Sequence, residues 1–583
     1  AIGIWAFPVA PFLLLGALTL YGALLWRYPV AWLAVVPAAL AILDPSPITG
    51  RLPLDAFDLV VLVTLAVGYA RLLGVSPAPW SNRWFPVAWV LLWISWAIAT
   101  ARGLWPLGDL GWPLPDTSHS AVEAWMVGKG LLWALLLVPL LRRVPAPLVP
   151  HARRLFVAGV LIALAGVAVS VLWERHLFVG ITDFSGVFRV TGPFASMHTG
   201  GAYIEAFLAF AIPFAAVGAF IARSVWLRIG AIVLVALGTY AMMVTFSRGG
   251  WFGLAVGLSV VVIGLLRGSG GPRRWAVAGG LAAVVLAAAL PVLMGGFAQA
   301  RIALIVGDWE FRLSHWANAL SIMEPGLPTA LFGEGFGRYP TVYLLRSDYR
   351  QPPGNFAIVS AARDASAAAS SDVTPVRAEP VEGPTHRFLR LGTGEPAYLD
   401  QRVAVQPGQP YRLSLRMRQT TEGGRLRVAL CEKALLYSFQ CLWLDPEPPR
   451  AGAGWSETTI DFDSGGLGRG GNWPHPPVVL SLYNAGRGAV EVDLVSLATL
   501  DGRELLANGD FSDGSRRWLF VTDRFPAWHI DQMWVEVYFA QGLLGLGAII
   551  VLLVAAAAGL QKALRSRERW VLSLTAALLA FLA

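Results

Sequence analysis

The chain has 583 residues, of which 56% are hydrophobic and 14% are charged, and its mean hydropathy is +0.58. Soluble domains of this length do not carry so large an apolar fraction, so the composition indicates a polytopic membrane protein. The formal net charge of +8 does not indicate nucleic-acid binding, because the basic residues lie in short loops between apolar segments and there set the orientation of the spans.

Apolar segments of membrane-spanning length recur along the chain and give about twelve predicted spans. They lie at residues 3–26, 29–43, 56–74, 84–101, 121–141, 155–173, 200–222, 229–246, 251–266, 275–297, 532–560 and 570–583. Many of the 25 tryptophans lie near the ends of these segments, as is typical of aromatic side chains at the membrane–water interface. We therefore expect a mainly α-helical transmembrane bundle.

Lysines and arginines concentrate in every second connection between the predicted spans. They are Arg27, Arg71, Arg83, Arg142, Arg143, Arg153, Arg154, Arg223, Arg228, Arg267, Arg273, Arg274, Lys562, Arg565, Arg567 and Arg569. Cytoplasmic loops are enriched in such residues, so the pattern predicts a single orientation for the bundle. The outer side then carries the loops 102–120, 174–199, 247–250 and 298–531. The chain would begin on the outer side, and we expect a further helix before Ala1 to correct this.

The long outer loop is predicted to be folded. It begins with a helical pattern at residues 309–323, followed by the glycine-rich turn GEGFGRYP at 333–340 and a connector rich in Pro, Ala and Ser at about 352–380. The hydrophobic period then changes from helical to two, which is typical of short antiparallel strands with one buried face. Leu413 and Leu415, for example, alternate with Arg412, Ser414 and Arg416. A β-sandwich, jelly-roll-like, fits this pattern best.

Four regions follow from this division of the chain. They are transmembrane helices at 1–297, a helical part of the large loop at 298–351, the β-sandwich insertion with its connector at 352–528, and C-terminal transmembrane helices at 529–583. The only two cysteines, Cys431 and Cys441, lie in the insertion. An external loop of this size favours a disulfide between them, which agrees with the predicted orientation and indicates the periplasm of a Gram-negative cell.

Four polar residues converge on the outer face in this topology: Arg189, Arg248, Arg312 and His529. Arginine is costly in hydrocarbon, so one placed at a membrane boundary is a candidate for binding something there. Guanidinium groups can neutralise the charge on a departing phosphate, and a neutral histidine can orient a hydroxyl group or take its proton.

Each of these residues also has a purely structural interpretation. Arg248 then merely extends to the membrane interface, and Arg312 forms a surface pair with Glu310 or Asp308. The other two are then an ordinary loop arginine and an interfacial histidine. The conjunction of the four supports a site more strongly than any one of them alone.

Several charged side chains lie inside or at the edge of predicted spans. Intramembrane charges are functional candidates by default, and Lys129, Glu205 and Glu536 are therefore possible supporting residues. A structural Lys–Glu pair that ties helices together explains them equally well. The eight histidines are scattered, and no metal-ligand spacing or phosphate-binding loop is present in the sequence. The sequence therefore predicts neither a metal nor a cofactor.

The segment SRGGWFGLAVGL at 247–258 resembles a motif of the O-antigen ligase and polymerase superfamily of bacterial membrane glycosyltransferases. The similarity covers about 150–350 and 525–560. It extends to Arg189 before a glycine and small residues, to Arg312 before the glycine-rich turn, and to His529 before a helix with QGLLG at 541–545.

This resemblance implies a GT-C-like membrane fold and metal-independent, inverting transfer of a glycan from undecaprenyl diphosphate. It implies that Arg189 and Arg248 hold the diphosphate and that His529 binds or deprotonates the acceptor. Arg312 supports the two arginines as a substrate-binding residue. The other substrate-binding residues that we expect are Ser247, Trp316 and Asp531.

The sequence departs from the family pattern in two places. Asp531 lies near His529 where many relatives have Asn directly after the histidine, and the β insertion is absent from most relatives. We expect an exopolysaccharide or O-antigen polymerase, with a ligase onto lipid A-core or protein as the alternative. A transporter or flippase of lipid-linked glycan and a non-catalytic polysaccharide-binding scaffold are alternatives of other classes.

The expected partners are the lipid-linked oligosaccharide donor, a glycan acceptor and the lipid bilayer, with a flippase and a chain-length regulator as further candidates. The expected location is the bacterial inner membrane, with the large loop in the periplasm.

Overall fold

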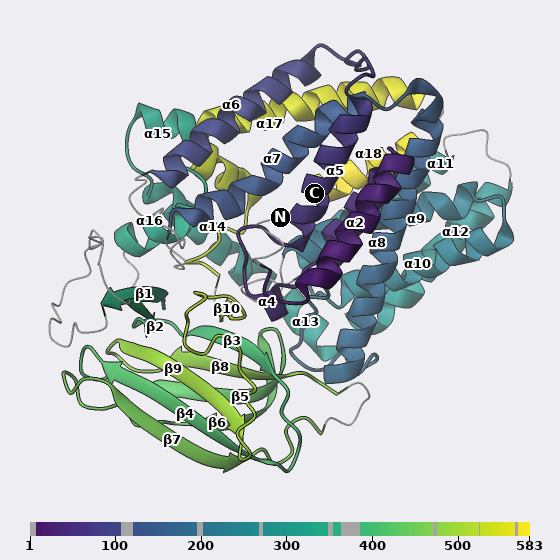
Figure 1. The fold of residues 1–583 in the computed structure, drawn as a ribbon. Coiled ribbons are helices and arrows are strands. Elements are labelled where there is room, and N and C mark those ends of the chain that lie inside the picture. Colours follow the sequence, from purple (N-terminus) through teal and green to yellow (C-terminus); the bar gives the residue numbers. More distant parts are fainter. Residues whose placement is uncertain are drawn as a thin grey trace.

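The computed structural model describes residues 7–105, 120–194, 202–266, 272–347, 354–362, 385–469, 475–523, 525–565 and 569–583. Two parts are evident in Figure 1: a helix bundle and a β-sandwich that lies against one end of it. The helices come from both ends of the sequence, and the sandwich comes from the segment between them. The bundle is therefore completed only by the last two helices of the chain.

A helix forms at each of the twelve apolar segments predicted from the sequence. These helices are α2 (Pro11–Arg27), α3 (Trp32–Ile42), α5 (Ala56–Leu72), α6 (Trp84–Leu104), α7 (Val122–Arg142), α8 (Val149–Phe178), α9 (Ala202–Ile221), α10 (Val225–Met243), α11 (Arg248–Leu266), α12 (Pro272–Leu293), α17 (Met533–Arg565) and α18 (Arg569–Leu582). Within the described residues, eight helices are long and apolar enough to cross a membrane, namely α6 to α12 and α17. Helices α2, α3 and α18 are apolar but shorter.

Two of the basic connections predicted from the sequence bring helix ends together. Cation–π contacts illustrate this: the Arg71 guanidinium lies 5.1 Å from the ring centroid of Trp26, and that of Arg153 lies 4.5 Å from the ring centroid of Trp570. These pairs join the end of α5 to the end of α2, and the start of α8 to the start of α18. The ends of α2 and α5 are therefore neighbours, as are the starts of α8 and α18.

Five short helices lie at the end of the bundle that faces the sandwich, which we call the sandwich end. They are α4 (Ser46–Thr49), α13 (Gly296–Ala303), α14 (Ile305–Ser321), α15 (Leu327–Phe332) and α16 (Tyr339–Arg346). Helix α14 corresponds to the helical pattern predicted at 309–323. In Figure 1 α4, α13, α14 and α16 lie between the long helices and the strands, whereas α15 lies beside α6 and α17.

The insertion consists of two five-stranded antiparallel sheets. One has the order β1-β2-β9-β4-β7 and the other the order β10-β3-β8-β5-β6. The strands are β1 (Phe356–Ala362), β2 (Thr385–Leu391), β3 (Ala397–Val403), β4 (Pro410–Gln419), β5 (Leu426–Ala434), β6 (Tyr437–Leu444), β7 (Ser456–Asp463), β8 (Val478–Asn484), β9 (Val490–Thr499) and β10 (Leu519–Thr522). Their inward apolar side chains form one core, for example Leu413 of β4 and Leu430 of β5, both fully buried. The alternation of apolar and polar residues in the sequence therefore predicts correctly which side chains of these strands are buried.

Strand β1 lies within the segment that was predicted to be a connector. It pairs with β2 along its whole length, from Phe356 opposite Leu391 to Ala362 opposite Thr385. The sequence FAIVSAA contains small residues and no clear alternation, so the pairing with β2 decides its conformation rather than its own pattern. The sandwich therefore begins earlier than the strand pattern indicates.

The sandwich is continuous with the bundle rather than suspended from it. Its apolar core extends to Ala319 of α14, Tyr339 of α16 and Phe539 of α17. A second contact lies after α4, where the Thr49 carbonyl accepts a hydrogen bond of 2.8 Å from the backbone N–H of Arg517. A Cβ on Gly50 would lie only 2.7 Å from the carbonyl oxygen of Trp518. The two parts therefore share one packed interface.

The glycine-rich turn packs against three long helices at once. Gly333, Gly335 and Gly337 all have positive φ, at 72°, 107° and 68°. A Cβ on each of them would lie within 2.5 Å of backbone atoms of α17, α6 and α7, respectively. These positions require glycine both for their conformation and for close approach.

The QGLLG segment meets the same turn. Helix α17 is kinked at Gly542, whose φ of 63° and ψ of −160° are not helical. The break frees backbone carbonyls, and Phe539 and Ala540 accept hydrogen bonds of 2.7 and 3.1 Å from the N–H groups of Glu334 and Gly335. Two motifs that are about 200 residues apart therefore form one structural joint.

Candidate functional site

One face of α14 carries polar side chains toward the sandwich end of the bundle. Asp308, Arg312 and His315 are spaced by four and three residues, which places them on the same side of a helix. Asp308 contacts Arg248, Arg312 contacts Asp531, and His315 contacts the backbone of the His529 segment. The helix thus collects contacts from two distant parts of the sequence, the start of α11 and the segment before α17.

Arg248 is the first residue of α11, and its guanidinium lies against α13 and α14. Its Nη1 donates a hydrogen bond of 2.9 Å to the backbone carbonyl of Arg301. Its Nη2 pairs with the Asp308 carboxylate, and Arg301 Nη1 lies 3.3 Å from the same Asp308 oxygen. Two guanidinium groups therefore share one carboxylate. The sequence interpretation in which Arg312 pairs with Asp308 is wrong, because Asp308 pairs with these two arginines instead.

Ser247 forms the start of α11. Its hydroxyl oxygen accepts a hydrogen bond of 3.2 Å from the N–H of Gly250, as N-cap residues do. The residue before it, Phe246, has a φ of 51° and is fully buried. This tight entry directs the positive end of the α11 dipole, together with Arg248, toward the site. Ser247 therefore has a structural role, whether or not it also contacts a substrate.

Arg189 reaches the same place from the loop after α8. Its Nε donates a hydrogen bond of 2.8 Å to the Thr245 carbonyl, just before α11. The following residues are held by the buried Glu174 carboxylate of α8, which accepts hydrogen bonds from the N–H groups of Thr191 and Gly192 at 3.2 and 2.6 Å. Arg189 is thus tied to the connection between α10 and α11, and the residues after it are tied to α8.

The four arginines of the site interact electrostatically as one group. Burial lowers the pKa of Arg301, and the nearby charges of Arg189, Arg248 and Arg312 lower it further, whereas Asp308 raises it. Arg301 Nε is buried and has no hydrogen-bond partner. We call these four residues the arginine cluster. Arg301 was not predicted from the sequence.

Acidic side chains only partly balance the arginine cluster. Asp308 pairs with two of its members, and Asp531 lies 3.3 Å from Arg312. Glu205 of α9 interacts electrostatically with Arg189, Arg312 and Asp531, and its buried Oε2 has no hydrogen-bond partner. The ion pairs within the described residues therefore give the cluster two carboxylates for four guanidinium groups.

His529 lies directly beside the cluster in the turn that leads into α17. Its backbone carbonyl lies 3.1 Å from His315 Nε2, so a neutral His315 with its proton on Nε2 donates this bond. Burial lowers the pKa of His315, although the bond to His529 and the charge of Asp531 oppose this. Asp531 itself has a φ of 54°, which Asp and Asn tolerate better than most residues. The segment is thus held at both residues.

Two further side chains place the start of α9 and of α17 at the same site. Tyr203 is 61% exposed, yet it interacts electrostatically with Glu536, Arg51 and Asp531. Glu536 is exposed near the start of α17. Two exposed side chains, Tyr203 and Glu536, therefore lie within electrostatic range of Asp531.

Lys129 lies elsewhere and does not support the site. Its Nζ pairs with Asp55 at 2.9 Å and Asp58 at 2.6 Å, and Trp133 Nε1 donates to the other oxygen of Asp58 at 2.7 Å. These contacts tie α5 to α7 next to the capping box that starts α5. The interpretation of Lys129 as part of an ion pair that ties helices together is therefore correct, although its partners are aspartates and not a glutamate.

Trp316 packs within the protein. Its ring meets that of Trp309 edge to face at 5.7 Å and lies against the sandwich core. Its Nε1 is buried without a hydrogen-bond partner. These contacts give the residue a packing role on α14, and the proposed contact with a substrate stays a prediction.

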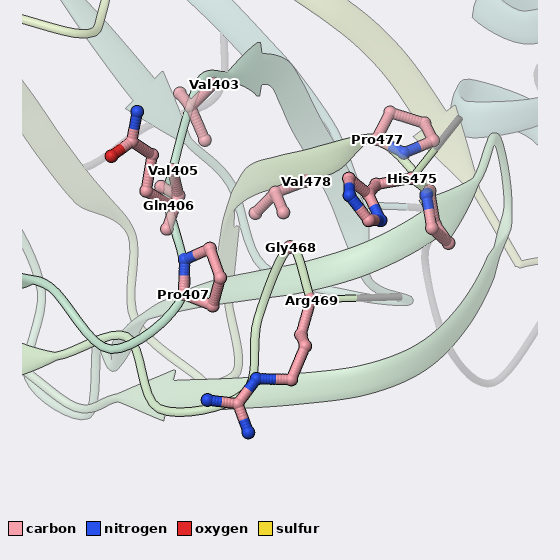
Figure 2. A pocket seen from close by; sticks show the side chains of 10 residues that line it. Val403, Val405, Gln406, Pro407, Gly468, Arg469, His475, Pro477 and Val478 are labelled. Atoms are coloured by element: carbon pink, nitrogen blue, oxygen red, sulfur yellow. The ribbon is translucent and has the colours of Figure 1, made fainter. Parts of the chain in front are cut away.

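Cys431 and Cys441 are directly opposite each other on β5 and β6 and form a disulfide. The sandwich also has a surface hollow of about 480 Å³ between the ends of β3 and β8, lined in part by Val403, Val478 and His475 (Figure 2). None of the predicted site residues lines it. Within the described residues, no three His, Cys, Asp or Glu side chains are placed to hold a metal ion.

Comparisons of the chain with protein-family models, curated proteins and solved structures give no significant match. The resemblance to the ligase and polymerase superfamily therefore stays a prediction that rests on the residues themselves. The structure brings Arg189, Arg248, Arg312, Asp531 and the His529 segment together. The same group includes Glu205, Glu536 and Ser247.

Sequence reasoning missed Arg301 and His315 as members of this group. The spacing of Asp308, Arg312 and His315 along one helix face was an available signal for His315. Arg301 had no such signal, because its position depends on how α13 packs beside α11.

Proposed function

We propose that the protein is a membrane glycosyltransferase that moves a glycan from undecaprenyl diphosphate to an acceptor, and that it polymerises an exopolysaccharide or O-antigen. In this proposal the bundle is GT-C-like and crosses the inner membrane about twelve times. The sandwich end faces the periplasm, and the sandwich itself is jelly-roll-like.

The observation that carries the proposal is the arginine cluster. Arg189, Arg248 and Arg312 each lie within electrostatic range of Arg301. The four guanidinium groups have only two ion-paired carboxylates, Asp308 and Asp531, so an anion that bridges the arginines adds stability. A diphosphate carries enough charge and enough acceptor oxygens to meet several guanidinium forks at once.

The surroundings of the cluster fit a lipid-linked donor. Arg248 stands at the N-terminus of α11, where backbone N–H groups also favour an anion. The cluster lies at the end of apolar helices, so a phosphate bound there leaves its lipid chain free to extend into the bilayer. A soluble nucleotide sugar has no need for such a position.

The proposed reaction is a single displacement at the anomeric carbon. An acceptor hydroxyl oxygen attacks that carbon, the bond to the phosphate oxygen breaks, and undecaprenyl diphosphate leaves with the electron pair. The arginine cluster stabilises the negative charge that develops on the leaving phosphate. His529 accepts the hydroxyl proton as general base, and Asp531 and Arg312 hold its segment in place. Attack from the side opposite the diphosphate inverts the configuration.

The experiment is glycan profiling of a deletion strain that carries wild type, Arg248→Ala or His529→Ala. The matched control is Arg412→Ala, which removes an exposed arginine of the sandwich that pairs only with the exposed Asp461 in the described structure. We expect single repeat units to accumulate in both site variants, with long polymer in the wild type and the control.

The outcomes separate the candidate functions. Long polymer that stays on undecaprenyl diphosphate in the site variants would indicate that the protein is a ligase and not a polymerase. Normal surface polymer in both site variants would contradict glycosyl transfer at this site and leave transport or scaffolding.

A further inference from the structure

The hairpin formed by β5 and β6 has an apolar tip. Hairpins with a two-residue connection favour Asn or Gly there, but this one has Leu435 and Leu436, and Leu435 has a φ of 48°. Ala434, Tyr437 and Phe439 continue the apolar surface. An apolar tip is unfavourable in water, so its composition is explained if the tip packs against another part of the protein.

The tip packs against the helix bundle next to the arginine cluster. Phe439 stacks on Phe178, the last residue of α8, with ring centroids 4.8 Å apart and planes at 22°. Tyr437 and Phe439 also contact Phe188, with centroids 4.9 and 5.7 Å apart. Ala434 is buried in the apolar core of the bundle itself. Aromatic pairs of this kind contribute beyond their buried area.

Phe188 is the residue directly before Arg189. Its side chain is almost fully buried, at 2% exposure. The segment is therefore held on one side of Arg189 by the hairpin and on the other side by the Glu174 carboxylate, through Thr191 and Gly192. The hairpin itself is closed by the disulfide between strands β5 and β6. A continuous series of contacts thus runs from the disulfide to a guanidinium group of the site.

We infer that the disulfide-closed hairpin is a positioning element of the site: Tyr437 and Phe439 hold Phe188, and Phe188 fixes Arg189 for the diphosphate. The inference rests on the proposed function for the role of Arg189. It gives the inserted sandwich a direct part in the reaction, because small displacements of a binding group slow a reaction markedly. The hairpin acts through Arg189 and does not touch the substrate.

The first test is amide hydrogen exchange of the full-length protein in detergent. Phe439→Ala removes the stacked ring, and we expect the amides of Val190, Thr191 and Gly192 to exchange at least about tenfold faster, because their loop loses one of its supports. Trp443→Ala is the matched control: it lies on the same strand, is 48% exposed, and packs against other sandwich residues. In the control variant, the exchange rates of these amides should equal those of the wild type.

The second test is the yield of long polymer in the complemented deletion strain. We expect Phe439→Ala to lower it about tenfold to a hundredfold, as a misplaced binding group does. Phe439→Tyr should restore both the yield and slow exchange, because it keeps the ring. Cys431→Ser should also lower the yield of long polymer, but by less than Phe439→Ala does. Trp443→Ala should give the wild-type yield.

Unchanged exchange at residues 190–192 in Phe439→Ala would overturn the inference. So would faster exchange without loss of polymer, since the hairpin would then hold the loop without serving the site. Failure of the proposed function is recognised separately: Arg248→Ala would then give normal polymer. The exchange measurement reports on the hairpin in either case.

Discussion

At the scale of single residues, the site is defined by four arginines and the carboxylates that pair with them. Arg248 and Arg301 share Asp308, and Arg312 pairs with Asp531. Sequence motifs predicted three of the four arginines, because those three lie in segments that resemble a family. Arg301 lies in the last turn of the short helix α13, which has no distinctive sequence pattern, so only the packing of α13 reveals it.

Replacement of Arg301 tests whether the structure adds a true member to the site. We expect Arg301→Ala to lower the yield of long polymer about tenfold or more, since a charge-assisted hydrogen bond contributes about 1.5–3 kcal/mol. Arg301→Lys should lower the yield of long polymer less, because it keeps the positive charge and loses only the two-pronged hydrogen bonding of the guanidinium group. Glycan profiling measures the yield. A wild-type yield in Arg301→Ala would restrict the site to the other three arginines.

His315 gives a prediction about pH. Burial lowers its pKa in the folded protein, so the unfolded chain binds the proton more readily. The stability that neutral His315 contributes is therefore present above about pH 6.5, the ordinary value for histidine, and is lost as the pH falls toward the lower folded value. His315→Gln keeps a donor for the His529 carbonyl but does not titrate. The fall in melting temperature from pH 8 to pH 5 should therefore be smaller in this variant than in the wild type. Equal falls in both proteins would contradict this account.

At the scale of elements, the sequence predicted where helices and strands occur but not what joins them. The glycine-rich turn was recognised as a turn from its composition. Its contacts with α6, α7 and α17 depend on which helices are neighbours, and no local pattern carries that information. Strand β1 was missed for the same reason, since its partner β2 decides its conformation.

Gly335 is the sharpest test of the joint between the turn and the helices. Its φ is 107°, and a Cβ would lie 2.5 Å from the backbone nitrogen of Gly103. We expect Gly335→Ala to destabilise the protein by about 2–4 kcal/mol, through backbone strain and overpacking together. Thermal unfolding in detergent measures this. Gly547→Ala in α17 is the control, because nothing lies within 4 Å of its Cβ position; similar melting of the two variants would argue against the close-packed turn.

At the scale of the whole molecule, the alternation of basic loops predicted a single orientation for the bundle, and the pairs Arg71–Trp26 and Arg153–Trp570 join helix ends that this pattern places on one side. The sequence did not predict that the sandwich packs on the bundle. That interface is formed by Tyr437, Phe439 and the core shared with α14. In the sequence alone, these side chains cannot be distinguished from ordinary strand and helix residues.

Thiol labelling tests the orientation. The disulfide uses both native cysteines, so an added cysteine is the one free thiol. Glu457→Cys lies on an exposed strand position of the sandwich and Ser224→Cys in the exposed loop before α10. A membrane-impermeant maleimide applied to cells with a permeabilised outer membrane should label Glu457→Cys and should label Ser224→Cys only after lysis. The reverse pattern would contradict the predicted orientation.

The central claim is that the arginine cluster binds a lipid diphosphate, and the most direct test is binding of undecaprenyl diphosphate to the purified full-length protein. The account predicts saturable binding to the wild type and to Arg412→Ala, and affinity lower by about tenfold to a hundredfold in Arg248→Ala, as expected for the loss of one charge-assisted contact. Equal affinity in all three proteins would contradict the claim.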